Sequence, residues 1–190
     1  HGAKLFLADS NRKNFPCFVI FPQCTAESAW SSVKVDRSTT PVTFSFDYTV
    51  TPNWPLVSAI EMLKQTVGSE SIDKSRIYIT GLSMGGMGTF EAVYRNPDLF
   101  AAAMPICGGG DTVHYNKTIH KTSFWIFHGA ADAVVSVKES QAMVNKLNSL
   151  DADVTYTEYP GVNHNSWDNA FAEATYISWM FSHQRKKVKW

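Results

Sequence analysis

Residues 77–86 have the sequence Ile77-Tyr78-Ile79-Thr80-Gly81-Leu82-Ser83-Met84-Gly85-Gly86. An apolar, β-branched run, typical of a buried strand, leads into Gly-x-Ser-x-Gly and then into apolar residues at helical spacing. A sharp turn from strand to helix exposes the serine hydroxyl at the edge of a sheet, and its glycines let backbone and helix approach closely. The helix N-terminus behind the turn favours developing negative charge. This order predicts a nucleophile elbow at Ser83, and a plain glycine-rich turn is the alternative.

Strand and helix patterns alternate along the rest of the chain. Short apolar runs predict buried strands at 17–21, 77–80, 101–106 and 124–127, and a more alternating run predicts one at 154–159. Helical spacing occurs at 56–67, 87–95, 137–150 and 170–183. Because this alternation is typical of parallel strands joined by covering helices, we expect an α/β fold with a mostly parallel sheet and helices on both faces. Alternation from Phe44 to Val50 predicts an extra half-exposed strand or hairpin arm.

Composition and charge narrow the class of protein. The chain has 190 residues, of which 44% are hydrophobic and 18% charged, enough for one domain over residues 1–190 with a substantial core. The formal net charge is zero, which gives no electrostatic footprint for nucleic acid. No apolar run approaches the roughly 18–20 residues that span a bilayer. We therefore expect neither nucleic acid nor a membrane as partner, and the oligomeric state stays open.

The three cysteines do not have the spacing of metal ligands. Cys17 falls within a predicted buried strand, so we expect a buried free thiol. Cys24 and Cys107 both follow predicted strands. They could pair as a disulfide in an exported protein or remain free.

Serine, histidine and aspartate follow predicted strands, whose carboxyl ends collect the functional residues of open α/β sheets. Ser83 needs an adjacent general base. His164, on a Gly/Asn-rich loop after the last strand, is the candidate; His128 is the alternative base, although we expect it to hydrogen-bond loop backbone. Asp132, after the preceding strand, is the candidate acid that orients the base, with a helix N-cap as its other interpretation. Asp111 is the alternative acid, or a loop or substrate-pocket residue.

Four segments, 81–86, 105–111, 128–132 and 159–167, resemble the polyhydroxyalkanoate-depolymerase-like esterases of the α/β-hydrolase fold. They are most similar to the branch labelled "predicted peptidase", which includes carboxylesterases and feruloyl or acetylxylan esterases. The order Ser, Asp, His is that of α/β-hydrolases. The resemblance covers nearly the whole chain and implies a triad of Ser83, Asp132 and His164. It also implies an oxyanion-hole donor in the backbone N–H of Met84, and Trp167 near the pocket wall.

One part of the family pattern is missing from this sequence. The family has further strands before this region, ending in a His-Gly-x-Gly-type loop that donates a second oxyanion-hole N–H. His1-Gly2 is not that motif, because no strand precedes it. We therefore expect either that this chain is the C-terminal part of a longer protein or that another segment fills the gap.

The expected activity is that of a serine carboxylesterase that works through an acyl-enzyme. Candidate substrates are small-molecule or polysaccharide-linked esters, including aryl, feruloyl and acetyl esters of plant polysaccharide. A serine peptidase of the same fold and a non-catalytic binding module on a hydrolase scaffold are the alternatives. No metal or organic cofactor is implied. The resemblance implies a secreted or periplasmic location, although the sequence shows no signal peptide.

Overall fold

The computed structural model describes residues 1–39 and 41–185. Its main sheet has the strand order β3-β4-β5-β6, and every neighbouring pair is parallel. These strands are β3 (Tyr78–Leu82), β4 (Ala102–Ile106), β5 (Ser123–Gly129) and β6 (Val154–Tyr159). The predicted mostly parallel sheet is confirmed, and β3, which leads to Ser83, is an edge strand of the described sheet.

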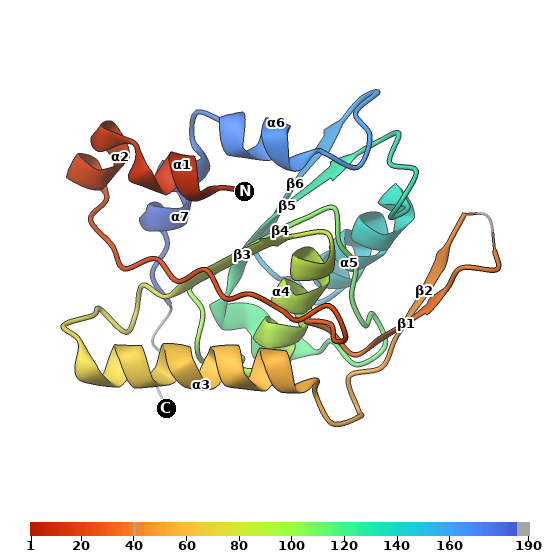
Figure 1. The fold of residues 1–190 in the computed structure, drawn as a ribbon, viewed down its shortest axis with the longest axis horizontal. Helices are drawn as coiled ribbons and strands as arrows, with labels where there is room; N and C mark the ends of the chain where they lie inside the picture. The colour runs from red at the N-terminus through yellow and green to blue at the C-terminus, as the bar shows by residue number, and fades with distance from the viewer. Residues whose placement is uncertain (40, 186–190) are drawn as a thin grey trace.

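Helices cover both faces of this sheet (Figure 1). One face carries α3 (Trp54–Ser69), α4 (Met84–Arg95) and α5 (Val137–Ser149). The other carries α6 (Trp167–Ala172) and α7 (Tyr176–Ser182), with α1 (Ala3–Leu7) and α2 (Asp9–Asn14) beside them. In β5, Phe124 and Ile126 pack in the first core, whereas Trp125 and Phe127 pack in the second. Because successive side chains of a strand point to opposite faces, one continuous apolar run supplies both cores.

The expected extra strand lies in a separate antiparallel hairpin. It consists of β1 (Val33–Asp36) and β2 (Thr43–Phe46). Tyr48 lies beyond β2 and is only 2% exposed, because its ring packs in the core beside Tyr94 and Tyr115. A short 3₁₀-helix, η1 (Lys117–Lys121), precedes β5.

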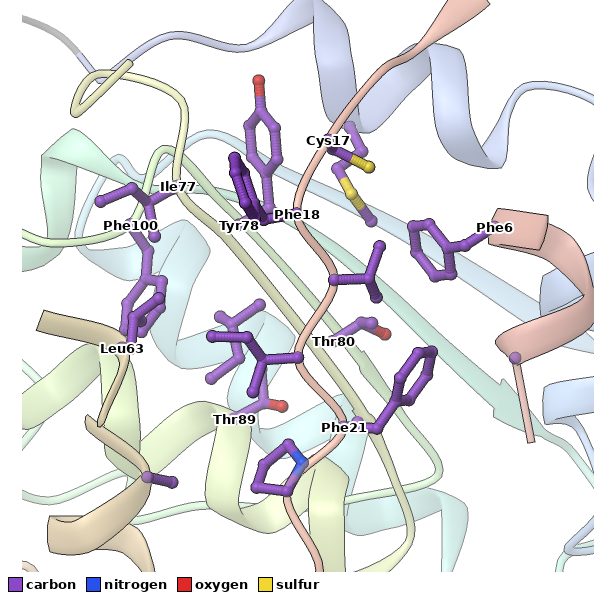
Figure 2. Close-up of a pocket in the computed structure, with 18 of the residues that line it drawn as sticks. Phe6, Cys17, Phe18, Phe21, Leu63, Ile77, Tyr78, Thr80, Thr89 and Phe100 are labelled. Carbon is purple, nitrogen blue, oxygen red and sulfur yellow. The ribbon is translucent and has the colours of Figure 1, made fainter. Parts of the chain in front are cut away.

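The predicted strand at 17–21 is wrong. This segment is extended but belongs to neither sheet, and Cys17, expected to be buried, is exposed. A groove of about 1550 Å³ lies between residues 16–23 and residues 76–83 of the β3 region. Figure 2 shows Phe18 and Phe21 on this extended segment, which passes Tyr78 and Thr80 of β3; all four side chains line the groove. A strand needs a partner about 4.8 Å away, and the groove separates this segment from β3.

The predicted helix at 170–183 is divided into α6 and α7. Glu173 leaves the helical conformation, with φ −59° and ψ 120°, and its carboxylate accepts a hydrogen bond of 2.8 Å from Tyr159 Oη. The short helices α1 and α2 were not predicted. None of the helices in the described part of the chain combines the length and apolar character needed to cross a bilayer.

Glu91 lies on α4 and is a charged side chain that is completely buried. Its carboxylate accepts hydrogen bonds from Ser31 Oγ at 2.9 Å, from the backbone N–H and the hydroxyl of Ser32 at 2.5 and 2.8 Å, and from Arg95 Nε at 2.7 Å. A buried carboxylate is tolerated when donors surround it in this way. Glu91 therefore ties the loop before β1 to α4.

Candidate active site

Ser83 occupies the sharp turn between β3 and α4. Its φ is 53°, a left-handed value that is uncommon outside glycine. Its backbone N–H donates to Ile106 O at 2.9 Å, and its carbonyl accepts from Met87 N–H at 3.0 Å. A strained residue persists only when its surroundings hold it, and such positions cluster at functional sites. The predicted strand–turn–helix arrangement is present.

The structure brings the three predicted residues together in one chain of hydrogen bonds. His164 Nε2 lies 2.9 Å from Ser83 Oγ, and His164 Nδ1 lies 2.8 Å from Asp132 Oδ2. Each residue follows the carboxyl end of a parallel strand: Ser83 follows β3, Asp132 follows β5 and His164 follows β6. Because parallel strands end at the same edge of the sheet, residues 81 positions apart meet there.

Asp132 is held as a buried carboxylate. Its Oδ1 accepts from the backbone N–H groups of Val134 and Val135 at 2.8 and 2.9 Å. Burial alone would raise its pKa, but the hydrogen bonds from His128, His164 and these two N–H groups hold the pKa well below its usual range. The N-cap interpretation is wrong, because the hydroxyl of Ser136 accepts from Lys138 N–H at the start of α5.

The surroundings of His164 stabilise its protonated form. The hydrogen bond to Asp132, together with the nearby Cys107 thiol, raises its pKa to about 9, although burial opposes this shift. The Asp132 carboxylate beside Nδ1 favours the tautomer in which Nδ1 carries the hydrogen, so that the unprotonated Nε2 faces Ser83. The same carboxylate stabilises the imidazolium that forms when Nε2 takes up a proton. The pair can therefore accept the hydroxyl proton of Ser83.

Cys107 lies beside this hydrogen-bond chain, which the sequence did not predict. Its φ is 41°, and its Sγ lies within 4.8 Å of a carboxylate oxygen of Asp132 and a ring nitrogen of His164. Cys24 and Cys107 are both buried free thiols, so the disulfide that the sequence left open is not formed. Cys107 follows β4, and its position at a strand exit was the sequence signal that could have placed it near the site.

Asp47, Asp111 and His114 form a separate group, whose oxygen and nitrogen atoms lie close enough to one another to hold a metal ion.

The remaining predicted site residues lie around this centre in different ways. Met84 is the first residue of α4, where the backbone N–H has no intrahelical acceptor. The Trp167 ring meets the His164 ring edge to face, with centroids 5.5 Å apart. Their predicted roles as oxyanion donor and pocket wall stay predictions.

Asp111 is not the acid that orients His164. Its buried carboxylate accepts from the backbone N–H groups of Tyr48, Val113 and His114 and lies 2.7 Å from His114 Nδ1. The side chain thus fixes its own loop against the segment after β2. A contact between Asp111 and substrate stays a prediction.

We expect kcat/KM of a reaction in which Ser83 is the nucleophile to increase with pH as His164 loses its proton, because only the neutral imidazole can accept a proton from Ser83. With the pKa of His164 raised to about 9, most of this increase should lie above 6.5, its ordinary value. Asp132→Asn removes the main cause of the shift while keeping the shape, so the midpoint should fall toward 6.5. The measurement is a pH–rate profile of both proteins, and an unchanged midpoint in the variant would contradict the assignment.

The raised pKa of His164 also makes the stability of the folded protein depend on pH. The folded protein binds the His164 proton more tightly than the unfolded chain does, so this contribution is complete below pH 6.5 and is lost as pH rises through about 9. Thermal unfolding followed over the same pH series separates this loss of stability from the gain in activity.

The chain is similar to several known proteins. A crystal structure of a thermostable esterase matches with a TM-score of 0.82 and 35% identity, over 95% of this chain and 48% of that one. Poly(3-hydroxyalkanoate) depolymerase C of Paucimonas lemoignei is 43% identical over 53 residues, 28% of this chain and 13% of the relative. The bifunctional acetylxylan esterase/xylanase XynS20E of Neocallimastix patriciarum is 28% identical over 53% of this chain and 15% of its own length.

The chain therefore spans less than half the length of these relatives. Arabidopsis thaliana SOBER1, at 19% identity and a TM-score of 0.59, shares the fold. The parallel sheet covered by helices, together with the match to the esterase structure, identifies the α/β-hydrolase fold. The profile of the phospholipase/carboxylesterase family matches residues 51–178, more than half of the chain. This chain belongs to the phospholipase/carboxylesterase family of α/β-hydrolases.

Proposed function

We propose that this protein is a serine carboxylesterase with Ser83 as nucleophile, His164 as general base and Asp132 as the orienting acid. The observation that carries the proposal is the continuous hydrogen-bond chain from Ser83 Oγ through both nitrogens of His164 to the buried Asp132 carboxylate. A serine hydroxyl is a weak nucleophile unless a base removes its proton, and this contact supplies the base. Membership of a carboxylesterase family supports the same activity.

In the proposed mechanism, Ser83 Oγ attacks the ester carbonyl while its proton moves to His164 Nε2. The carbonyl oxygen becomes an oxyanion and accepts a hydrogen bond from the backbone N–H of Met84. Collapse of this intermediate breaks the bond to the alcohol, which leaves with the proton from His164. Water then gives a proton to His164 and attacks the acyl-enzyme, and the carboxylic acid departs as Ser83 recovers its proton. Asp132 accepts a hydrogen bond from His164 Nδ1–H in every step.

We propose esters linked to plant polysaccharide, with acetyl or aryl acyl groups, as the substrate class. The similarity to the bifunctional acetylxylan esterase/xylanase of Neocallimastix patriciarum supports acetyl esters. Trp167, whose ring packs against His164, is the side chain we propose to contact the acyl group.

The test is a fluorophosphonate probe, which labels an activated serine, combined with parallel assays on short-chain aryl esters and peptide amides. We expect labelling of the native protein and faster turnover of esters than of amides. Amide turnover that exceeds ester turnover would replace the esterase with a serine peptidase. Absence of both labelling and turnover would instead support a binding module on a hydrolase scaffold.

A further inference from the structure

A second histidine, His128, contacts the Asp132 carboxylate. The His128 side chain is completely buried, at the end of β5. Its Nε2 lies 2.9 Å from Val135 O and 3.2 Å from Asp132 Oδ2, and its Nδ1 lies 2.7 Å from Ser140 Oγ. A carbonyl and a carboxylate only accept hydrogen bonds, so Nε2 must carry a hydrogen. The Nε2–H of His128 therefore donates to Val135 O and also faces the Asp132 carboxylate at 3.2 Å.

Asp132 consequently receives donors on every side. Its Oδ1 accepts from the backbone N–H groups of Val134 and Val135, and its Oδ2 lies 2.8 Å from His164 Nδ1 and 3.2 Å from His128 Nε2. A carboxylate has about four acceptor positions; three hydrogen bonds fill three of them here, and the Nε2–H of His128, shared with Val135 O, faces the fourth. Rotation of the carboxylate plane would therefore break buried hydrogen bonds and move Oδ2 away from both histidines.

The other nitrogen of His128 leads to the turn that carries Ser83. Ser140 Oγ, which lies 2.7 Å from Nδ1, also lies 2.8 Å from Gly108 O. Gly108 packs so closely on α4 that a Cβ there would lie 2.7 Å from the carbonyl carbon of Gly86 and 2.9 Å from Met87 N. His128 thus connects the acid of the site to the helix that begins behind the nucleophile.

We propose that His128 is a positioning residue: its Nε2–H fixes the Asp132 carboxylate on His164 and withdraws part of the carboxylate's negative charge from that histidine. The inference rests on the proposed roles of Asp132 and His164. His128 acts through them and touches no reacting atom.

The direction of its effect follows from charge. Without a second donor, Asp132 would place its full negative charge on His164 and stabilise the imidazolium further. The removal of His128 should therefore move the midpoint of the kcat/KM profile to higher pH. Other titratable groups near these two histidines are Cys107 beside His164, Glu139 on α5 and Glu158 on β6. They remain unchanged in the variants below, so the difference reports on His128.

Two amide substitutions separate the two nitrogens of the ring. His128→Gln places an amide nitrogen near the position of Nε2 and can still donate to Asp132. His128→Asn is shorter and can reach only Ser140. We expect the Asn variant to lose about 10- to 100-fold in kcat with little change in KM, and its pH midpoint to rise. The Gln variant should recover most of the lost kcat and the original midpoint.

Ser140→Ala is the matched control, because it removes the contact at Nδ1 and leaves the contact at Nε2 intact. Its pH midpoint should equal that of the native protein. Equal losses in the Asn and Gln variants with an unmoved midpoint would overturn the proposal and leave His128 as a packing residue.

A measurement on the native protein keeps the question decidable if neither His128 variant folds. Nitrogen-15 NMR of histidine should show Nε2 of His128 protonated throughout the titration of His164, and an unprotonated Nε2 would overturn the proposal. If the native protein neither hydrolyses esters nor reacts with the fluorophosphonate, the proposed function fails. The NMR result still decides the His128 contact.

Discussion

The Ser83→Ala variant is expected to lose ester hydrolysis by about 10⁶-fold in kcat. His164 Nε2, 2.9 Å from Ser83 Oγ in the native protein, would then have no hydroxyl to deprotonate, and no acyl-enzyme could form. Binding and the oxyanion donor survive the substitution, so a residual rate of about 10³–10⁴ over water is expected. Steady-state kinetics with a short-chain aryl ester measure the loss, and labelling by a fluorophosphonate should disappear with it.

Ser149→Ala is the matched control for this loss. Ser149 is exposed at the end of α5, and its hydroxyl donates only within its own helix, to Lys146 O at 2.7 Å. Its kcat and labelling should equal those of the native protein. Labelling that persists in Ser83→Ala would show that another residue is the nucleophile.

Gly81→Ala is expected to destabilise the fold by about 3 kcal/mol, the upper part of the range for overpacked sites. A Cβ on Gly81 would overlap the carbonyl oxygen of Gly85 and lie 2.9 Å from Thr89 Oγ1. Neither neighbour can move freely, because Thr89 Oγ1 donates to that same carbonyl at 2.8 Å. At about 2–4 °C per kcal/mol, Tm should fall by roughly 6–12 °C, as measured by calorimetry.

Gly85→Ala tests the same motif without the clash. A Cβ on Gly85 would have no neighbour within 4 Å, and alanine is favoured over glycine inside a helix by about 0.5–1 kcal/mol. Its Tm should therefore stay level or rise. If both glycine variants lost stability equally, close packing at Gly81 would not explain its presence in the turn.

Most of the fold was predictable because its signals are local. The run that became β6 alternates over residues 154–159, and the structure has β6 at Val154–Tyr159. The strand that leads to Ser83 and the helix that follows it differ from their predicted bounds by a few residues. The segment at 17–21 is as apolar as a buried strand but belongs to neither sheet of the described residues, so a prediction from composition alone was wrong there. Strand propensity is expressed only where a ladder can form.

The candidate site was predictable for a topological reason. Serine, aspartate and histidine follow three strands, and parallel strands bring those exits to one edge. Local sequence also distinguished His164, on its Gly/Asn-rich loop, from the other histidines. The expectation that His128 hydrogen-bonds loop backbone is confirmed by its contact with Val135 O. Local sequence could not place Glu91 or the contact of His128 with Asp132, because partners such as Ser31 for Glu91 come from other segments of the chain.

The amino-acid sequence by itself thus determined the alternation of strands and helices, the turn at Ser83 and the identity of its two partners. Each of these depends on patterns within a few residues and on the rule that parallel strands share an edge. Only the tertiary structure decided the open groove beside β3, the burial of Glu91, the approach of Cys107 and the second histidine on Asp132. Those depend on distances between segments far apart in sequence, and burial makes each polar side chain take the partners that the completed fold places within reach.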